Sequence, residues 1–131
     1  VTLGPVLPYL TDSLENLQAL LADCVDAKVY GVLLNGFGVT LRAGASAYFF
    51  SCLRELSPEL PEAYEALLPP GKVGKTASFL SPNAAALAEL FGTSTAACGL
   101  VTDPEELFAF RHAFQDRRSG QQLSLFDLYD L

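Results

Sequence analysis

One segment of the chain, residues 29–50, constrains the fold more than any other, and it reads VYGVLLNGFGVTLRAGASAYFF. Its apolar beginning predicts a buried strand, and its aromatic end predicts an amphipathic helix. Between them, Gly36 and Gly38 predict a turn that needs positive φ or a close backbone approach. Asn35 and Arg42 therefore fall between a strand and a helix, where ligands of parallel α/β sheets bind. The alternative is that Asn35 satisfies the turn and Arg42 pairs with a surface carboxylate.

The segment before it completes a strand–helix–strand unit. Residues 1–10 are mostly apolar and predict a buried strand that ends near Leu7. Asp12 and Glu15 have the spacing of a capping box and predict a helix start. Residues 28–34 predict the second strand, so the two strands should be parallel neighbours with a right-handed crossover. The helix between them should turn inward its apolar positions Leu14, Leu17, Leu21, Cys24 and Val25.

Four more helices are expected after the glycines. The first should bury a stripe made of Ala45, Tyr48, Phe49, Cys52, Leu53 and Leu56. Ser57 and Pro58 mark the start of the second helix, which should turn inward Leu60, Tyr64, Leu67 and Leu68. The third should start at Ser81-Pro82 and run through Phe91, and the fourth should be capped by Asp103, with Leu107, Phe110, Arg111 and Phe114 on its stripe.

This order of elements predicts an α/β fold. Two strands alone make a marginal sheet, so we expect a βαβ piece of a partial parallel, TIM-like barrel followed by a mainly helical C-terminal cap. The expected divisions are late barrel strands and helices in 1–57, the helical cap in 58–115, and a linker with a C-terminal tail in 116–131. Half of the residues are hydrophobic and no Met opens the chain, so we expect a piece of a larger protein whose apolar faces meet a missing partner.

Composition excludes several classes of function. The formal net charge is −7, from 8 basic and 15 acidic residues, so this segment is not expected to bind nucleic acid directly. No apolar run reaches the roughly 18 residues that a membrane span needs. Three widely spaced cysteines argue against a disulfide framework and a four-thiolate zinc site, and for a reducing cytoplasm.

Two apparent catalytic signals have simpler explanations. Gly74-Lys75-Thr76 resembles the end of a phosphate-binding loop, but the position of that motif's first glycine is Pro69, so a polar connector is the better interpretation. His112 is the only histidine of the chain and lies beside Arg111 on a predicted helix. A solvated or capping role suits it better than catalysis.

The tail carries a short peptide motif. Gln122, Leu123, Leu125 and Phe126 form Q-L-S-L-F, which resembles the peptide that binds the bacterial sliding clamp, with the consensus Q-L-x-L-F. Apolar anchors of such a peptide enter a preformed pocket while the glutamine fixes the register. The alternative is that these apolar side chains fold back on the chain's own surface.

Two longer segments resemble radical S-adenosylmethionine proteins of the spore photoproduct lyase-like group, often labelled DNA repair photolyases. The first is similar to that group's P-I-[IL]-P-x-[IL]-[NT]-D pattern, and here it consists of Pro5, Val6, Leu7, Pro8, Tyr9, Leu10, Thr11 and Asp12. The second is similar to G-x-T-L-R-x-G-x-x-x-Y-F-Y-x-x-L, through Gly38, Thr40, Leu41, Arg42, Gly44, Tyr48, Phe49 and Leu53. The resemblance covers most of residues 1–68 and the tail.

The resemblance implies a parent lyase-like enzyme that cleaves S-adenosylmethionine at a [4Fe–4S] cluster. It implies that Pro5, Pro8, Asn35 and Arg42 line the cofactor or substrate side. The group's cluster motif, C-x-x-x-C-x-x-C, does not occur in this sequence. The chain would then be the C-terminal piece of a bacterial protein, inactive alone, with no cofactor of its own and with the N-terminal barrel half as its partner. The alternative function is a non-catalytic interaction module that docks on the sliding clamp through its tail.

Overall fold

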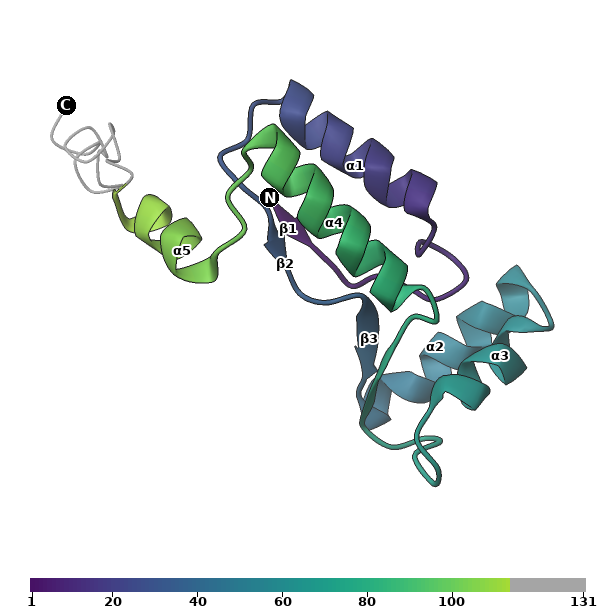
Figure 1. Ribbon diagram of the computed structural model, residues 1–131. Helices are drawn as coiled ribbons and strands as arrows, with labels where there is room; N and C mark the ends of the chain where they lie inside the picture. The colour runs from purple at the N-terminus through teal and green to yellow at the C-terminus, as the bar shows by residue number, and fades with distance from the viewer. Residues whose placement is uncertain (114–131) are drawn as a thin grey trace, which may run out of the picture.

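The computed structural model describes residues 1–113 of the chain, which form a mixed α/β structure (Figure 1). The expectations for Phe114, for the linker and for the tail residues Gln122, Leu123, Leu125 and Phe126 lie outside the described residues. In chain order the elements are β1 (Thr2–Leu3), α1 (Leu14–Asp26), β2 (Leu33–Leu34), β3 (Gly38–Leu41), α2 (Ala43–Leu56), α3 (Leu60–Leu67), β4 (Ala77–Leu80), α4 (Ala84–Cys98) and α5 (Pro104–Ala113).

The predicted βαβ unit is confirmed, with shorter strands. Strands β1 and β2 pair in parallel, with Thr2 opposite Leu33. Gly31 makes a further parallel bridge to Val101, so backbone from three parts of the chain runs side by side. The first strand was expected to reach Leu7, but β1 ends at Leu3, because Gly4 has a φ of +137° and the following proline has no N–H to donate.

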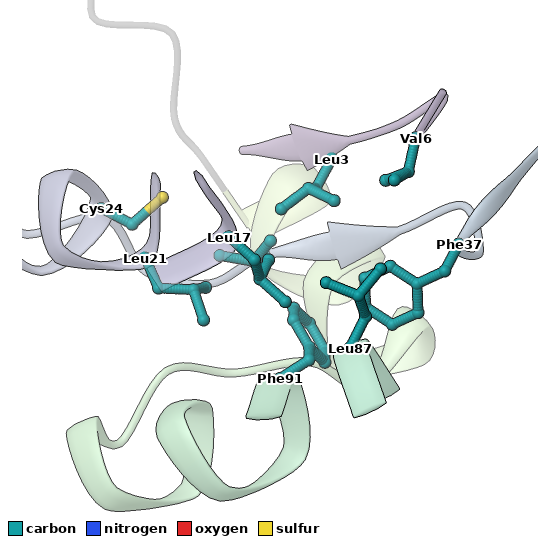
Figure 2. Close-up of a cluster of buried hydrophobic side chains, with 9 residues drawn as sticks. Leu3, Val6, Leu17, Leu21, Cys24, Phe37, Leu87 and Phe91 are labelled. Carbon is teal, nitrogen blue, oxygen red and sulfur yellow. The ribbon is translucent and has the colours of Figure 1, made fainter. Parts of the chain in front are cut away.

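Helices α1 and α4 pack against each other and cover one face of this sheet (Figure 1). The apolar side chains between them form the first core, in which Leu17, Leu87 and Phe91 meet Leu3 from β1 (Figure 2). Cys24 belongs to this core as a small hydrophobe. The other members are Val6, Leu21, Val32 and Phe37.

The beginning of α1 differs from the expected capping box. The N-cap is Ser13, whose Oγ accepts a hydrogen bond of 3.1 Å from the Asn16 N–H. Asp12 does not cap the helix, because its carboxylate is buried and accepts a 2.5 Å hydrogen bond from the Ser81 hydroxyl. Asp12 therefore links the start of α1 to the residues just before α4.

Residues 38–80 form a second unit, which we call the inserted lobe; residues 1–37 and 81–113 form the sheet lobe. In the inserted lobe, β3 and β4 pair antiparallel and α2 packs against α3. Neither strand was predicted, because Gly38 fits a turn and the sequence indicates no element for residues 77–80. The inserted lobe has its own core, made of Leu41, Phe50, Leu53, Tyr64, Leu68, Ala77 and Phe79.

The buried face of α2 differs from the predicted stripe. Tyr48 and Leu56 are 76% and 66% exposed, whereas Phe50 and Leu53 are 6% and 1% exposed. The helix carries apolar residues on two faces, so periodicity alone could not decide which face is inward. Packing against β3, β4 and α3 selects the face of Ser46, Phe50 and Leu53.

The last two helices follow the prediction in order but not in every boundary. Helix α4 begins at Ala84, later than expected, and runs beyond Phe91 to Cys98, where the C-cap Gly99 adopts the left-handed conformation with a φ of 68°. Helix α5 is capped as predicted, because Asp103 Oδ1 accepts a 2.9 Å hydrogen bond from the Glu106 N–H. None of the α5 residues from 104 to 113 is buried.

Helix α5 contacts Tyr30, just before β2, through an aromatic side chain and a hydrogen bond. The rings of Phe110 and Tyr30 stack with centroids 3.9 Å apart, and the Tyr30 hydroxyl donates to Glu106 Oε1.

Among the helices of residues 1–113, none is both long enough and apolar enough to cross a membrane.

Candidate functional site

A pocket of about 490 Å³ lies where the two parallel strands end. The sheet lobe contributes Gly4, Pro5, Asn35 and Gly36 to its wall. The inserted lobe contributes the opposite wall, which consists of Gly38, Val39, Thr40, Ser78, Phe79 and Leu80. The pocket thus has the position at the carboxyl ends of parallel strands where ligands of α/β sheets bind.

The end of the parallel ladder positions Asn35. Its N–H donates a 3.0 Å hydrogen bond to the Leu3 carbonyl oxygen, which fixes its backbone beside β1. A Cβ atom at Gly4 would lie 3.1 Å from the Asn35 Cβ, so glycine allows this close approach. Gly36 then turns the chain with a φ of +90°. Asn35 is therefore held at the pocket edge with its side chain exposed.

Close backbone packing forms the wall on the inserted lobe. A Cβ atom at Gly38 would lie 2.2 Å from the Phe79 carbonyl oxygen, so only glycine fits there. Across the same two strands, Thr40 Oγ1 and Ser78 Oγ share a hydrogen bond of 2.8 Å. No charged side chain of the described residues lines the pocket. Its chemistry is that of neutral hydrogen-bonding groups beside apolar surface, which suits an uncharged part of a ligand.

The structure brings together two of the four side chains that the resemblance assigned to a cofactor or substrate. Pro5 and Asn35 line the same pocket. Pro8 is fully buried, and its carbonyl oxygen accepts a 2.6 Å hydrogen bond from the Tyr64 hydroxyl. Arg42 is exposed at the N-cap of α2, at the opposite end of β3 from Gly38, and does not line the pocket.

Tyr64 connects the inserted lobe to the sheet lobe. Burial, together with the smaller effects of Asp12 and Tyr9, raises the pKa of its hydroxyl to about 12. The hydroxyl therefore keeps its proton at neutral pH and acts as a hydrogen-bond donor. The Tyr9 ring meets the Tyr64 ring edge-on, with centroids 6.0 Å apart.

A buried polar network lies where the inserted lobe ends. The Ser81 hydroxyl donates to Asp12 and accepts a 2.9 Å hydrogen bond from the Asn83 N–H. The Asn83 side chain donates to the Asp12 carbonyl oxygen at 3.2 Å. The sequence does not indicate these partners, because Asp12 and Ser81 are far apart in the chain and each also fits a local helix-start pattern.

The described residues offer no set of metal ligands. Residues 1–113 contain no group of three His, Cys, Asp or Glu side chains placed to hold a metal ion. The cysteines lie on three different helices, where Cys24 is buried, Cys52 half-buried and Cys98 exposed. His112 is exposed near the end of α5.

Comparison with known proteins gives one set of relatives. No protein-family model matches the chain, and no solved structure matches it. A stretch of 67 residues, 51% of the chain, is 40% identical to an uncharacterized protein of Mycobacterium bovis. The same identity and coverage relate it to uncharacterized proteins of two Mycobacterium tuberculosis strains. The match covers 19% of each relative, so this chain spans about a fifth of the length of the curated relatives it matches.

Proposed function

We propose that this chain is the C-terminal part of a radical S-adenosylmethionine enzyme of the spore photoproduct lyase-like group. In this proposal the whole protein is cytoplasmic and completes the parallel sheet as a partial barrel. The chain contributes late strands and one wall of the site, and it is inactive alone. The relatives that match it are much longer than the matched stretch, which fits a role as part of a larger protein.

The observation that carries the proposal is the shared pocket of Pro5 and Asn35. The resemblance places both residues on the cofactor or substrate side, and they come from separate segments of the chain. They meet at the carboxyl ends of adjacent parallel strands, in one pocket with neutral polar groups and apolar walls. We assign Asn35 to hydrogen bonding of the ligand and Pro5 to its apolar contact.

The proposed roles of the other two residues are different. The Pro8 carbonyl oxygen already accepts a hydrogen bond from the Tyr64 hydroxyl. We therefore assign Pro8 to supporting the wall of the site rather than to contact with a ligand. Arg42 lies outside the pocket of the described residues. A role for Arg42 in the whole enzyme would require a ligand that extends beyond this pocket along β3.

The iron–sulfur cluster does not fit this chain. Three cysteines on separate helices do not provide the close thiolate spacing that such a cluster needs. The described residues also form no other metal-binding group. In this proposal the ligands of the cluster therefore belong to another part of the parent protein.

Anaerobic reconstitution of the full-length gene product with iron and sulfide tests the proposal. We expect the absorption and electron paramagnetic resonance spectra of a [4Fe–4S] cluster, and 5′-deoxyadenosine when S-adenosylmethionine and a reductant are added. A protein that folds but gives neither the cluster spectrum nor 5′-deoxyadenosine would overturn it.

The Q-L-S-L-F motif supports a second candidate function, a non-catalytic module that docks on a bacterial sliding clamp. The residues concerned are Gln122, Leu123, Leu125 and Phe126, beyond the described part of the chain. A synthetic tail peptide should bind the clamp, and a peptide with Leu125→Ala and Phe126→Ala should not. Absence of binding at high micromolar peptide would remove this candidate. The two functions are compatible, since a DNA-associated enzyme can carry a clamp peptide.

A further inference from the structure

The two lobes have separate interiors. Helices α1 and α4 enclose one core and helices α2 and α3 the other, and each helix pair packs within its own lobe (Figure 1). A unit with its own core keeps its internal packing when it moves as a rigid body. The inserted lobe has such a core, so it can move relative to the sheet lobe without losing its internal packing.

The chain passes between the lobes at two adjacent points. It leaves the sheet lobe after Phe37 and returns at Ser81, and the Ser81 N–H donates a 2.9 Å hydrogen bond to the Phe37 carbonyl oxygen. Next to this pair, Gly36 has positive φ, and the site of its missing Cβ has no neighbour within 4 Å. The two connections between the lobes thus lie side by side, joined by a hydrogen bond, next to a glycine with free space around it. Such a short pair of connections can act as a hinge.

Away from this hinge, an aromatic contact holds the lobes together. The Tyr64 hydroxyl from α3 donates to the Pro8 carbonyl oxygen at 2.6 Å, and both groups are buried. Tyr9, on the sheet lobe, packs edge-on against the same ring. One hydrogen bond and one ring contact can be broken without unfolding either core.

The pocket lies between the lobes. Pro5 and Asn35 form its wall on the sheet lobe, and Thr40 and Ser78 form its wall on the inserted lobe. Rotation about the hinge would change the distance between these walls. Movement of the inserted lobe would therefore widen or narrow the entrance to the pocket.

We propose that the inserted lobe is a hinged lid over this pocket, and that the bond from Tyr64 to Pro8 latches the lid in the closed position. The inference goes beyond the proposed function, because it does not depend on which ligand the pocket takes. A ligand that contacts both walls would stabilise the closed state, and loss of the latch would populate an open state.

Distance measurements between spin labels on the two lobes test the lid. One label is attached to the native Cys98 on α4 and the other to Ala47→Cys on α2, two exposed positions. The full chain also carries Cys24→Ala and Cys52→Ser, so that no other thiol reacts. We expect Tyr64→Phe to increase the fraction of longer, open distances about fivefold, because one buried hydrogen bond is lost.

Two further variants make the result decisive. Tyr9→Ala weakens the latch from the sheet lobe and leaves the core of the inserted lobe untouched, so it should also increase the open fraction. Tyr30→Phe removes a tyrosine hydroxyl far from the latch and should leave the distances unchanged. A loss of helical circular dichroism in Tyr64→Phe would mean that this variant has partly unfolded. The test of the lid then rests on Tyr9→Ala alone. Unchanged distances in a folded latch variant would overturn the lid.

Discussion

The hydroxyl of Tyr64 donates a 2.6 Å hydrogen bond to the carbonyl oxygen of Pro8, 56 residues earlier in the chain. Tyr64 is 0% exposed and lies in the core of the inserted lobe, whereas Pro8 belongs to the loop after β1. This bond joins the inserted lobe to the loop that leads from β1 into α1.

Replacing Tyr64 by Phe should lower the free energy of unfolding by about 1–2 kcal/mol, because the Pro8 carbonyl oxygen is left buried without its donor. The ring and its packing remain, so the fold should persist. Urea denaturation followed by circular dichroism measures the change. Tyr30→Phe is the control, since its hydroxyl bonds Glu106 at the surface, and it should cost less than half as much. Equal losses in the two variants would contradict the special role of Tyr64.

Stability should fall at alkaline pH through the same residue. The ordinary pKa of tyrosine is 10.0, and burial raises the pKa of Tyr64 to about 12 in the folded protein. Above pH 10 the unfolded chain loses this proton more readily than the folded one, so stability is full below pH 10 and declines toward pH 12. Urea unfolding at a series of pH values should show a steeper decline in the parent chain than in Tyr64→Phe. Parallel declines would refute this assignment.

Gly38 should tolerate no side chain. A Cβ atom there would lie 2.2 Å from the Phe79 carbonyl oxygen, so Gly38→Ala must separate β3 from β4. We expect a loss of about 2 kcal/mol or more, as for overpacked sites. Gly92→Ala in α4 is the matched control, because nothing lies within 4 Å of its Cβ position and alanine favours helix by up to about 1 kcal/mol. A neutral Gly38→Ala would show that the two strands are not paired as described.

The register of α2 can be tested with two substitutions on opposite faces. Leu53 is 1% exposed, and Leu53→Ala should cost about 2–5 kcal/mol through the cavity it leaves. Tyr48 is 76% exposed, and Tyr48→Ala should change stability by no more than about 0.5 kcal/mol. Thermal or urea unfolding of both variants gives the comparison. A large cost at Tyr48 would favour the stripe that periodicity predicts.

The parts of the fold that sequence analysis predicted are those fixed by nearby residues. The β1–α1–β2 unit follows from apolar segments within 35 residues, and the Asp103 cap follows from a three-residue spacing. The antiparallel pairing of Gly38 with Leu80 joins segments far apart in the chain, and no local signal indicates it. Gly38 also resembles a turn residue, although its role is to allow close contact with Phe79.

The candidate site was predicted in part for the same reason. The resemblance assigns Pro5 and Asn35 to the same side of a site, and they line one pocket because their parallel strands end at the same edge of the sheet. The burial of Pro8 depends on Tyr64, and the position of Arg42 depends on the length of β3, which begins inside the segment assigned to a turn. Tertiary packing, rather than the motif itself, decides which motif residues can reach a ligand.

We propose that Asn35 faces the S-adenosylmethionine side of a larger enzyme, and binding of that cofactor to the full-length protein tests this role most directly. Calorimetry with the cluster-loaded protein should give a Kd about tenfold weaker for Asn35→Ala, as expected for one lost hydrogen bond. Gln18→Ala, exposed on α1 outside the pocket, should bind like the parent protein. Failure of the parent protein to bind S-adenosylmethionine, or equal affinity in Asn35→Ala and Gln18→Ala, would contradict the account.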